Sequence, residues 1–219
     1  MASQDVTLLD FVLGLGASIP EASTCSALIT HHAIQKVDMH RMQQYYGENL
    51  VPRDKQYSVN MLRRLIELGV DFNETWDQGY PLGHTIEQGW VDGSQFLVQN
   101  GARVESLGLF YAPPLHIAAR LGYFKTMELL LRYGADPNSI HFGYTPLMLV
   151  DTKESASLLL KYGASLTTQG SSNLTAVHMG IIDGKVELLS TLLTLSEAVS
   201  IVRKKGNRIC AFLSYAAKN

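Results

Sequence analysis

A glycine recurs at nearly regular intervals along this chain, and each time it ends a leucine-rich segment. The recurring glycines are Gly16, Gly69, Gly101, Gly134 and Gly163. The last three steps are 32, 33 and 29 residues, and the first is 53 residues. A period of about 33 residues is typical of stacked repeat units, and the first step equals one period plus about 20 inserted residues. The spacing therefore predicts an array of small units rather than one central core.

Each of these glycines has a physical reason to lie at the end of a helix. The residue that follows a helix often takes a left-handed conformation, which glycine adopts without a Cβ clash. The segment before Gly134 has apolar residues at helical spacing, namely Met127, Leu130 and Leu131. This spacing predicts a helix with one apolar stripe that packs against a neighbouring unit.

A second signal lies 11 or 12 residues after each of the last four glycines. It reads YPLGH at Tyr80, PPLHIAA at Pro113, TPLMLV at Thr145 and TAVHMG at Thr175. Threonine can cap the free N–H groups of a helix start, and proline suits the first helical position because it needs no N–H partner. The residues predicted to follow in the core are Leu82, Leu115, Leu147 and Val177. We also expect His116 and His178 to form hydrogen bonds across the connecting loops.

Together the two signals define a unit of helix, tight turn, helix and extended loop. The segment APPLHIAARLGYFKTMELLLRYGADPN closely resembles the ankyrin repeat. The resemblance covers residues 79–194 with three units and residues 57–73 with a second helix alone. It implies an all-α, ankyrin-like solenoid of stacked helix-turn-helix units with hairpin finger loops along one edge.

The same pattern predicts the domain organisation. We expect an irregular N-terminal partial repeat with an insertion at 1–56, ankyrin-like repeats at 57–194, and an incomplete repeat or cap at 195–219. Residues 212–219 resemble the first helix of a further unit. Because they supply little of the polar outer face that a cap needs, we favour a fragment of a longer protein over a capping helix.

Two of the units depart from the pattern. The unit that starts at Thr145 is three residues short around 151–153, and Met148 replaces its histidine. The unit at Tyr80 has Gly83 at the histidine position, with His84 one place later. We expect these departures to weaken the hydrogen bonding between units.

The resemblance implies that finger tips and the ends of first helices face a partner. The candidate binding residues at the tips are Trp76, Gln78, Leu109, Phe110, Ile140, Phe142 and Tyr144. Those at the helix ends are Glu87, Gln88, Arg120, Leu121 and Asp183. Aromatic residues are common anchors of protein interfaces, so Trp76, Phe110 and Phe142 are hypothesised to form one contiguous patch. The alternative is that these rings pack on adjacent fingers within the stack.

Composition and charge exclude several classes of function. The chain is 46% hydrophobic and 17% charged, which favours a folded core, and its net charge of -2 disfavours nucleic acid as the partner. Cys25 and Cys210 form no disulfide framework, which fits a reducing compartment. No signal peptide and no apolar run of about 20 residues is visible, so we expect no membrane insertion. These features predict a monomeric cytoplasmic protein, with the nucleus as the alternative.

The sequence therefore predicts a non-enzymatic module, a scaffold, adaptor or inhibitor, that binds an unidentified protein and uses no cofactor or metal. One alternative is a small enzyme or metal site in the irregular N-terminal region, built from His31, His32, Asp38 and His40. His32 and His40 lie eight residues apart, about 80° around a helix, which is poor geometry for zinc. The other alternative is a structural spacer that belongs to a larger multidomain repeat protein.

Overall fold

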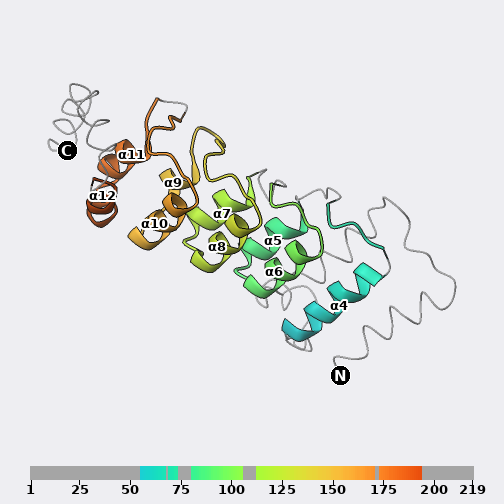
Figure 1. The fold of residues 1–219 in the computed structure, drawn as a ribbon. Coiled ribbons are helices and arrows are strands. Elements are labelled where there is room, and N and C mark those ends of the chain that lie inside the picture. Colours follow the sequence, from blue (N-terminus) through green and yellow to red (C-terminus); the bar gives the residue numbers. More distant parts are fainter. Residues whose placement is uncertain (1–54, 68, 74–79, 106–111, 171–172, 194–219) are drawn as a thin grey trace, which may run out of the picture. The chain divides into compact units, whose positions relative to one another are not determined.

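The computed structural model describes residues 55–67, 69–73, 80–105, 112–170 and 173–193 (Figure 1). The chain divides into two compact units, Met1–Tyr111 and Ala112–Asn219. The described residues form helices and connecting loops, and none of them belongs to a named β-strand. The predicted all-α fold is therefore confirmed.

The described part of the first unit contains three helices. They are α4 (Lys55–Glu67), α5 (Pro81–Glu87) and α6 (Val91–Gln99). The helices α5 and α6 pack against each other as a pair, and α4 packs against α6. Since α6 is the second helix of its pair, α4 occupies the place of a second helix from a preceding repeat. Leu62, Leu65, Leu82, Ile86 and Leu97 are buried between these helices.

The described part of the second unit contains three helix pairs. They are α7 (Pro114–Arg120) with α8 (Phe124–Arg132), α9 (Pro146–Leu149) with α10 (Lys153–Lys161), and α11 (Ala176–Ile182) with α12 (Val186–Leu193). The first helices pack in the order α7, α9, α11, and the second helices pack in the order α8, α10, α12 (Figure 1). Within this unit the repeats therefore stack in two helical layers, as the sequence predicted.

Four of the five recurring glycines end their helices as expected, and Gly16 lies outside the described residues. Gly69, Gly101, Gly134 and Gly163 have φ angles between +78° and +93°. After each of them, the next N–H donates to a carbonyl five residues back, as in the bond from Ala135 to the Leu130 carbonyl at 3.0 Å. This bond closes the end of the helix and turns the chain toward the finger.

The shortened repeat is visible in α9. This helix has four residues, whereas α7 and α11 each have seven. Val150 and Thr152 are extended, and α10 starts directly after them. At 1.5 Å of rise per residue, α9 ends about 4.5 Å short of a full-length first helix. The three missing residues therefore come from the end of the first helix, where the sequence placed the loss.

Candidate partner-binding surface

An asparagine fixes the base of a finger to the next repeat in the second unit. The side-chain amide of Asn138 donates to the Gly163 carbonyl at 2.9 Å, and its oxygen accepts the Ser165 N–H at 2.7 Å. The Asp136 carboxylate accepts the backbone N–H of Asn138 at 2.8 Å. Both ends of the amide are therefore used to join two repeats.

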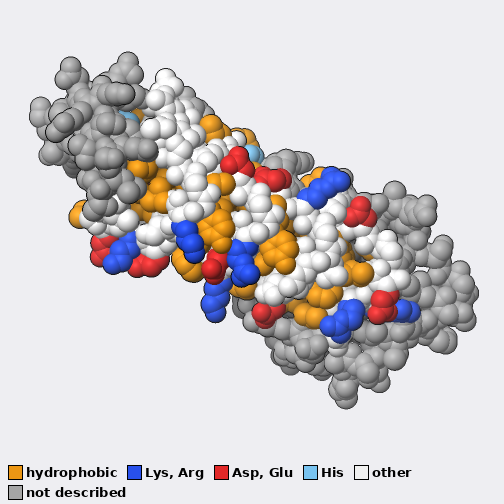
Figure 2. Space-filling model, in the orientation of Figure 1, with side chains coloured by type: hydrophobic (Ala, Val, Ile, Leu, Met, Phe, Trp, Pro, Cys, Tyr) orange, Lys and Arg blue, Asp and Glu red, His pale blue; other side chains and the backbone are white. Residues whose placement is uncertain are grey.

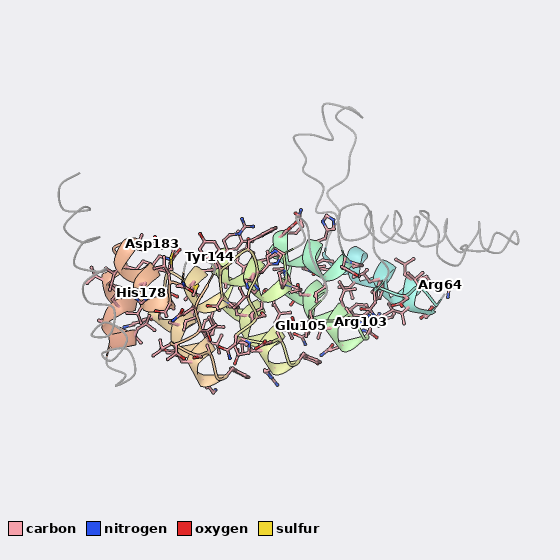
Figure 3. The ribbon with its side chains drawn as sticks, turned by 90° about the horizontal axis from the view of Figure 1, so that it is seen from above. Arg64, Arg103, Glu105, Tyr144, His178 and Asp183 are labelled. Carbon is pink, nitrogen blue, oxygen red and sulfur yellow. The ribbon has the colours of Figure 1, made fainter. Side chains whose placement is uncertain are left out.

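The first unit uses the same arrangement at Asn73. Its amide donates to the Gly101 carbonyl at 2.9 Å and accepts the Arg103 N–H at 2.8 Å (Arg103 is labelled in Figure 3). Asp71 accepts the Asn73 N–H at 2.8 Å. The sequence analysis did not predict these hydrogen bonds between repeats, although Asp-x-Asn recurs after two of the turn glycines and could have indicated them.

His116 ties the finger 139–144 to helix α7. Its Nε2 lies 3.0 Å from the Tyr144 carbonyl oxygen, which can only accept, so Nε2 carries the hydrogen. Burial lowers the pKa of His116, although its bond to the Tyr144 carbonyl acts in the opposite direction. The predicted bond across the loop is therefore confirmed for His116, and burial favours the neutral form of its ring.

His178 differs from His116 in its recorded bonds. The Thr175 N–H donates to Nδ1 of His178 at 3.2 Å, and the Thr175 hydroxyl lies 2.7 Å from the same nitrogen. These bonds lie within one motif and close the start of α11. The loop that would follow this repeat lies outside the described residues, so the cross-loop bond predicted for His178 stays a prediction.

The tip of this finger exposes large side chains. Phe142 is 79% exposed, Ile140 54% and Tyr144 42%. His141 and Tyr144 exchange two backbone hydrogen bonds of 2.9 and 3.0 Å and thereby close a tight turn. The next loop approaches from Gly170, where a Cβ atom would stand 1.9 Å from the Gly143 carbonyl oxygen. A glycine is therefore required at position 170 for the two loops to pack.

The predicted helix-end residues divide into two groups. Arg120, Leu121 and Asp183 are exposed, whereas Glu87 and Gln88 are half-buried. Asp183 also has a structural partner, because its carboxylate lies 3.1 Å from Nζ of Lys185 (Asp183 is labelled in Figure 3). Its carboxylate therefore already forms an ion pair with a residue of the same chain.

Lys185 is a residue that the sequence reasoning missed. Its Nζ lies 2.7 Å from the Asp151 carboxylate and 3.3 Å from the Val150 carbonyl, at the point where α9 is short. Burial alone lowers the pKa of Lys185, but the hydrogen bonds to Asp151 and Asp183 outweigh burial and raise it. Lys185 therefore joins the α11–α12 repeat to the shortened repeat before it.

Exposed large hydrophobic side chains among the described residues all lie in the second unit. They are Leu121, Phe124, Tyr133, Ile140, Phe142, Tyr144, Ile182 and Val186. On the face shown in Figure 2, hydrophobic side chains are interspersed with charged ones along the helices. The concentration of three such residues in one six-residue finger therefore marks that finger as a candidate contact surface.

Several predicted residues lie outside the part that the structure describes. At the finger tips these are Trp76, Gln78, Leu109 and Phe110. The candidate metal and enzyme region with His31, His32, Asp38 and His40 also lies outside it. Within the described ranges, no three His, Cys, Asp or Glu side chains are grouped to hold a metal ion. No helix in those ranges is long and apolar enough to cross a bilayer.

The helix pairs, glycine turns and finger loops define a helical repeat protein. A family model described as ankyrin repeats (3 copies) matches residues 54–141 and 115–205, which together cover more than half of the chain. The chain belongs to the ankyrin repeat family, and it carries a protein–protein interaction module.

Two curated proteins are similar to parts of the chain. The Probable 26S proteasome regulatory subunit p28 of Saccharomyces cerevisiae is 37% identical over 103 residues, which are 43% of this chain and 44% of that protein. The glycerophosphocholine phosphodiesterase gde1 of Schizosaccharomyces pombe is 34% identical over 85 residues, which are 36% of this chain and 8% of that protein. The chain thus spans less than half of the length of either relative.

Proposed function

We propose that this chain is a non-enzymatic module that holds a protein partner on its finger tips and first-helix ends, as a scaffold, adaptor or inhibitor. The observation that carries the proposal is the finger 139–144, where Ile140, Phe142 and Tyr144 face solvent although their backbone is tied to the repeat. Large apolar groups on a solvent-facing loop are typical of a surface that a partner covers.

The rigidity of the finger base supports this proposal energetically. Asn138 bonds to the next repeat, and His116 bonds to the Tyr144 carbonyl. A surface that is ordered before docking loses little conformational entropy when the partner binds. More of the interaction energy of the exposed side chains is then available as affinity.

The proposal extends to the neighbouring fingers. Trp76, Leu109 and Phe110 would supply further apolar anchors for the same partner. The surrounding polar and helix-end residues would form the rim, namely Gln78, Glu87, Gln88, Arg120, Leu121 and Asp183. We further propose that the chain acts as a monomer in the cytoplasm, with the nucleus as the alternative, and binds no nucleic acid, since its net charge is -2.

The test combines capture with thermal unfolding. The tagged full chain is incubated with extract from its source cells, and specific capture is defined by competition with excess untagged chain. A triple variant with Trp76→Ala, Phe110→Ala and Phe142→Ala is expected to capture the partner at least about tenfold less well at an unchanged melting temperature. Val186→Ala is the matched control, because Val186 is 76% exposed and lies at the start of α12, away from the fingers.

Two results would contradict the proposed surface. Capture that survives the triple substitution would move the binding surface elsewhere. A large fall in melting temperature would assign the three rings to the core of the stack instead.

A further inference from the structure

The turn at the tip of the finger 139–144 holds its aromatic residue in an unfavourable backbone conformation. Phe142 has φ +45° and Gly143 has φ +84°, so both central residues of the turn are left-handed. Two-residue turns of this kind favour Asn-Gly or Asp-Gly, because a side chain with a Cβ atom is strained in the left-handed region. Phenylalanine is therefore an outlier at position 142.

Burial does not compensate for this strain. The Phe142 side chain is 79% exposed, so it removes little apolar surface from water. The ring contact recorded for it is with His141, at 4.3 Å between centroids and 59° between planes. Backbone strain that no internal packing offsets is typical of functional positions.

The exposed ring is nevertheless connected to the core of the second unit. His141 meets His116 edge to face, with 5.7 Å between ring centroids. His116 is buried on α7 and bonds to the Tyr144 carbonyl at 3.0 Å. Three rings therefore lie in series from α7 to the tip of the finger.

The chemistry of the tip defines the complementary surface. Residues 139–144 read SIHFGY and contain no Asp, Glu, Lys or Arg. The exposed Ile140 and Tyr144 lie on the same finger as Phe142 and add apolar area beside it. A ring presented in this setting fits an uncharged, apolar pocket better than a charged surface, because a charged surface would lose water without gaining a partner.

We propose that Phe142 is a preorganised anchor that inserts its ring into an apolar pocket of the protein partner. This inference rests on the proposed function and names the partner's chemistry at one contact. The folded chain already holds the strained turn before binding, so docking the ring requires little further ordering. Aromatic side chains that fill pockets are the usual centres of binding energy.

The proposal predicts that one substitution raises the melting temperature and at the same time lowers partner capture. Phe142→Asn places a residue that tolerates the left-handed region at the strained position, so the melting temperature is expected to rise by roughly 2–4 °C. The same change removes the ring, so partner capture is expected to fall at least about tenfold. Phe142→Tyr retains a ring and is expected to keep capture within about threefold.

The experiment uses the full chain throughout. Thermal unfolding and quantified capture from source-cell extract are measured for wild type, Phe142→Asn, Phe142→Tyr and Val186→Asn, whose target residue is almost as exposed as Phe142. A fourth variant carries a photo-crosslinking benzoylphenylalanine at position 142, and the crosslinked partner residues are mapped by mass spectrometry. The expected result is loss of capture in Phe142→Asn alone, together with crosslinks to apolar residues.

The outcomes separate this proposal from the proposed function. If the wild type captures no protein that untagged chain displaces, both proposals fail. If the wild type captures a partner that Phe142→Asn retains within twofold, only the anchor is overturned. A lower melting temperature for Phe142→Asn would refute the strained turn, and crosslinks confined to charged residues would refute the apolar pocket.

Discussion

The α7–α8 repeat and the α9–α10 repeat have second helices of equal length, but their first helices differ in length. The helices α8 and α10 each have nine residues, with a fully buried leucine, Leu130 or Leu159, four residues before the turn glycine. The first helix has seven residues in α7 but four in α9. Within one unit, the apolar layer is thus retained while the first helix varies.

The polar contacts of the two first helices differ as well. His116 of α7 donates to the carbonyl of Tyr144 in the next finger. Met148 occupies the equivalent place in α9, and its sulfur accepts the Thr145 N–H at 3.4 Å within its own motif. The shortened repeat instead receives the Lys185 ammonium group from the repeat that follows. A repeat can therefore lose most of a helical turn when a neighbour supplies the polar contact.

The largest expected effect tests whether the second helices are equivalent. Leu130→Ala and Leu159→Ala each remove a fully buried side chain, so each is expected to lower the free energy of unfolding by about 2–5 kcal/mol. Urea denaturation of both variants measures this loss. Leu121→Ala, at an exposed position, is the control and should change stability by less than about 0.5 kcal/mol. If Leu159→Ala costs less than half as much as Leu130→Ala, the second helices are not equivalent.

A smaller effect tests the contact that supports the shortened repeat. Lys185→Met removes the ammonium group from Asp151, Asp183 and the Val150 carbonyl, and is expected to lower stability by about 1–2 kcal/mol. Urea denaturation at low and high salt measures the loss, which should shrink at high salt. Lys153→Met is the matched control, because Lys153 is exposed at the start of α10. Equal stability of the two variants would remove Lys185 from this role.

The pH dependence of the Lys185 contact follows from its raised pKa. A cation whose pKa is higher in the folded state stabilises the fold fully below its unfolded value of 10.5 and loses that contribution only above it. The difference between wild type and Lys185→Met should therefore stay constant from pH 5 to about pH 9. A difference that changes over this range would point to another titrating group.

The smallest expected effect is the pH dependence of stability that comes from His116, in the repeat with the full-length first helix. The folded state lowers the pKa of this ring below 6.5, so the unfolded chain takes up a proton more readily as pH falls. The contribution of His116 to the stability of the fold is therefore complete above pH 6.5 and decreases below it. Between pH 7.5 and pH 5.5, wild type should lose more stability than His116→Gln, whose amide can still donate to the Tyr144 carbonyl. Parallel pH profiles would show that His116 titrates alike in both states.

The sequence predicts which residues of the candidate site lie at the finger tip. It predicts little of their backbone conformation or of their contacts. The resemblance to the ankyrin repeat implies that Ile140, Phe142 and Tyr144 lie at a finger tip, and all three are exposed. Their role in binding stays a prediction. The left-handed backbone of Phe142 was not predictable, because the pattern for such turns favours asparagine or aspartate there. The engagement of Asp183 was also missed, because its partner Lys185 depends on how short α9 is.

The sequence by itself determined the repeat period, the helix starts and ends, the place of the three missing residues and the buried leucines. These follow from local rules, since glycine, proline and apolar spacing act within a few residues of the chain. Only the tertiary structure decided that Asn73 and Asn138 join repeats, that Lys185 supports its shortened neighbour and that Phe142 stands strained and exposed. These features depend on groups about 25 to 35 residues apart, or on a turn held by its surroundings, and stacking alone brings such groups within bonding distance.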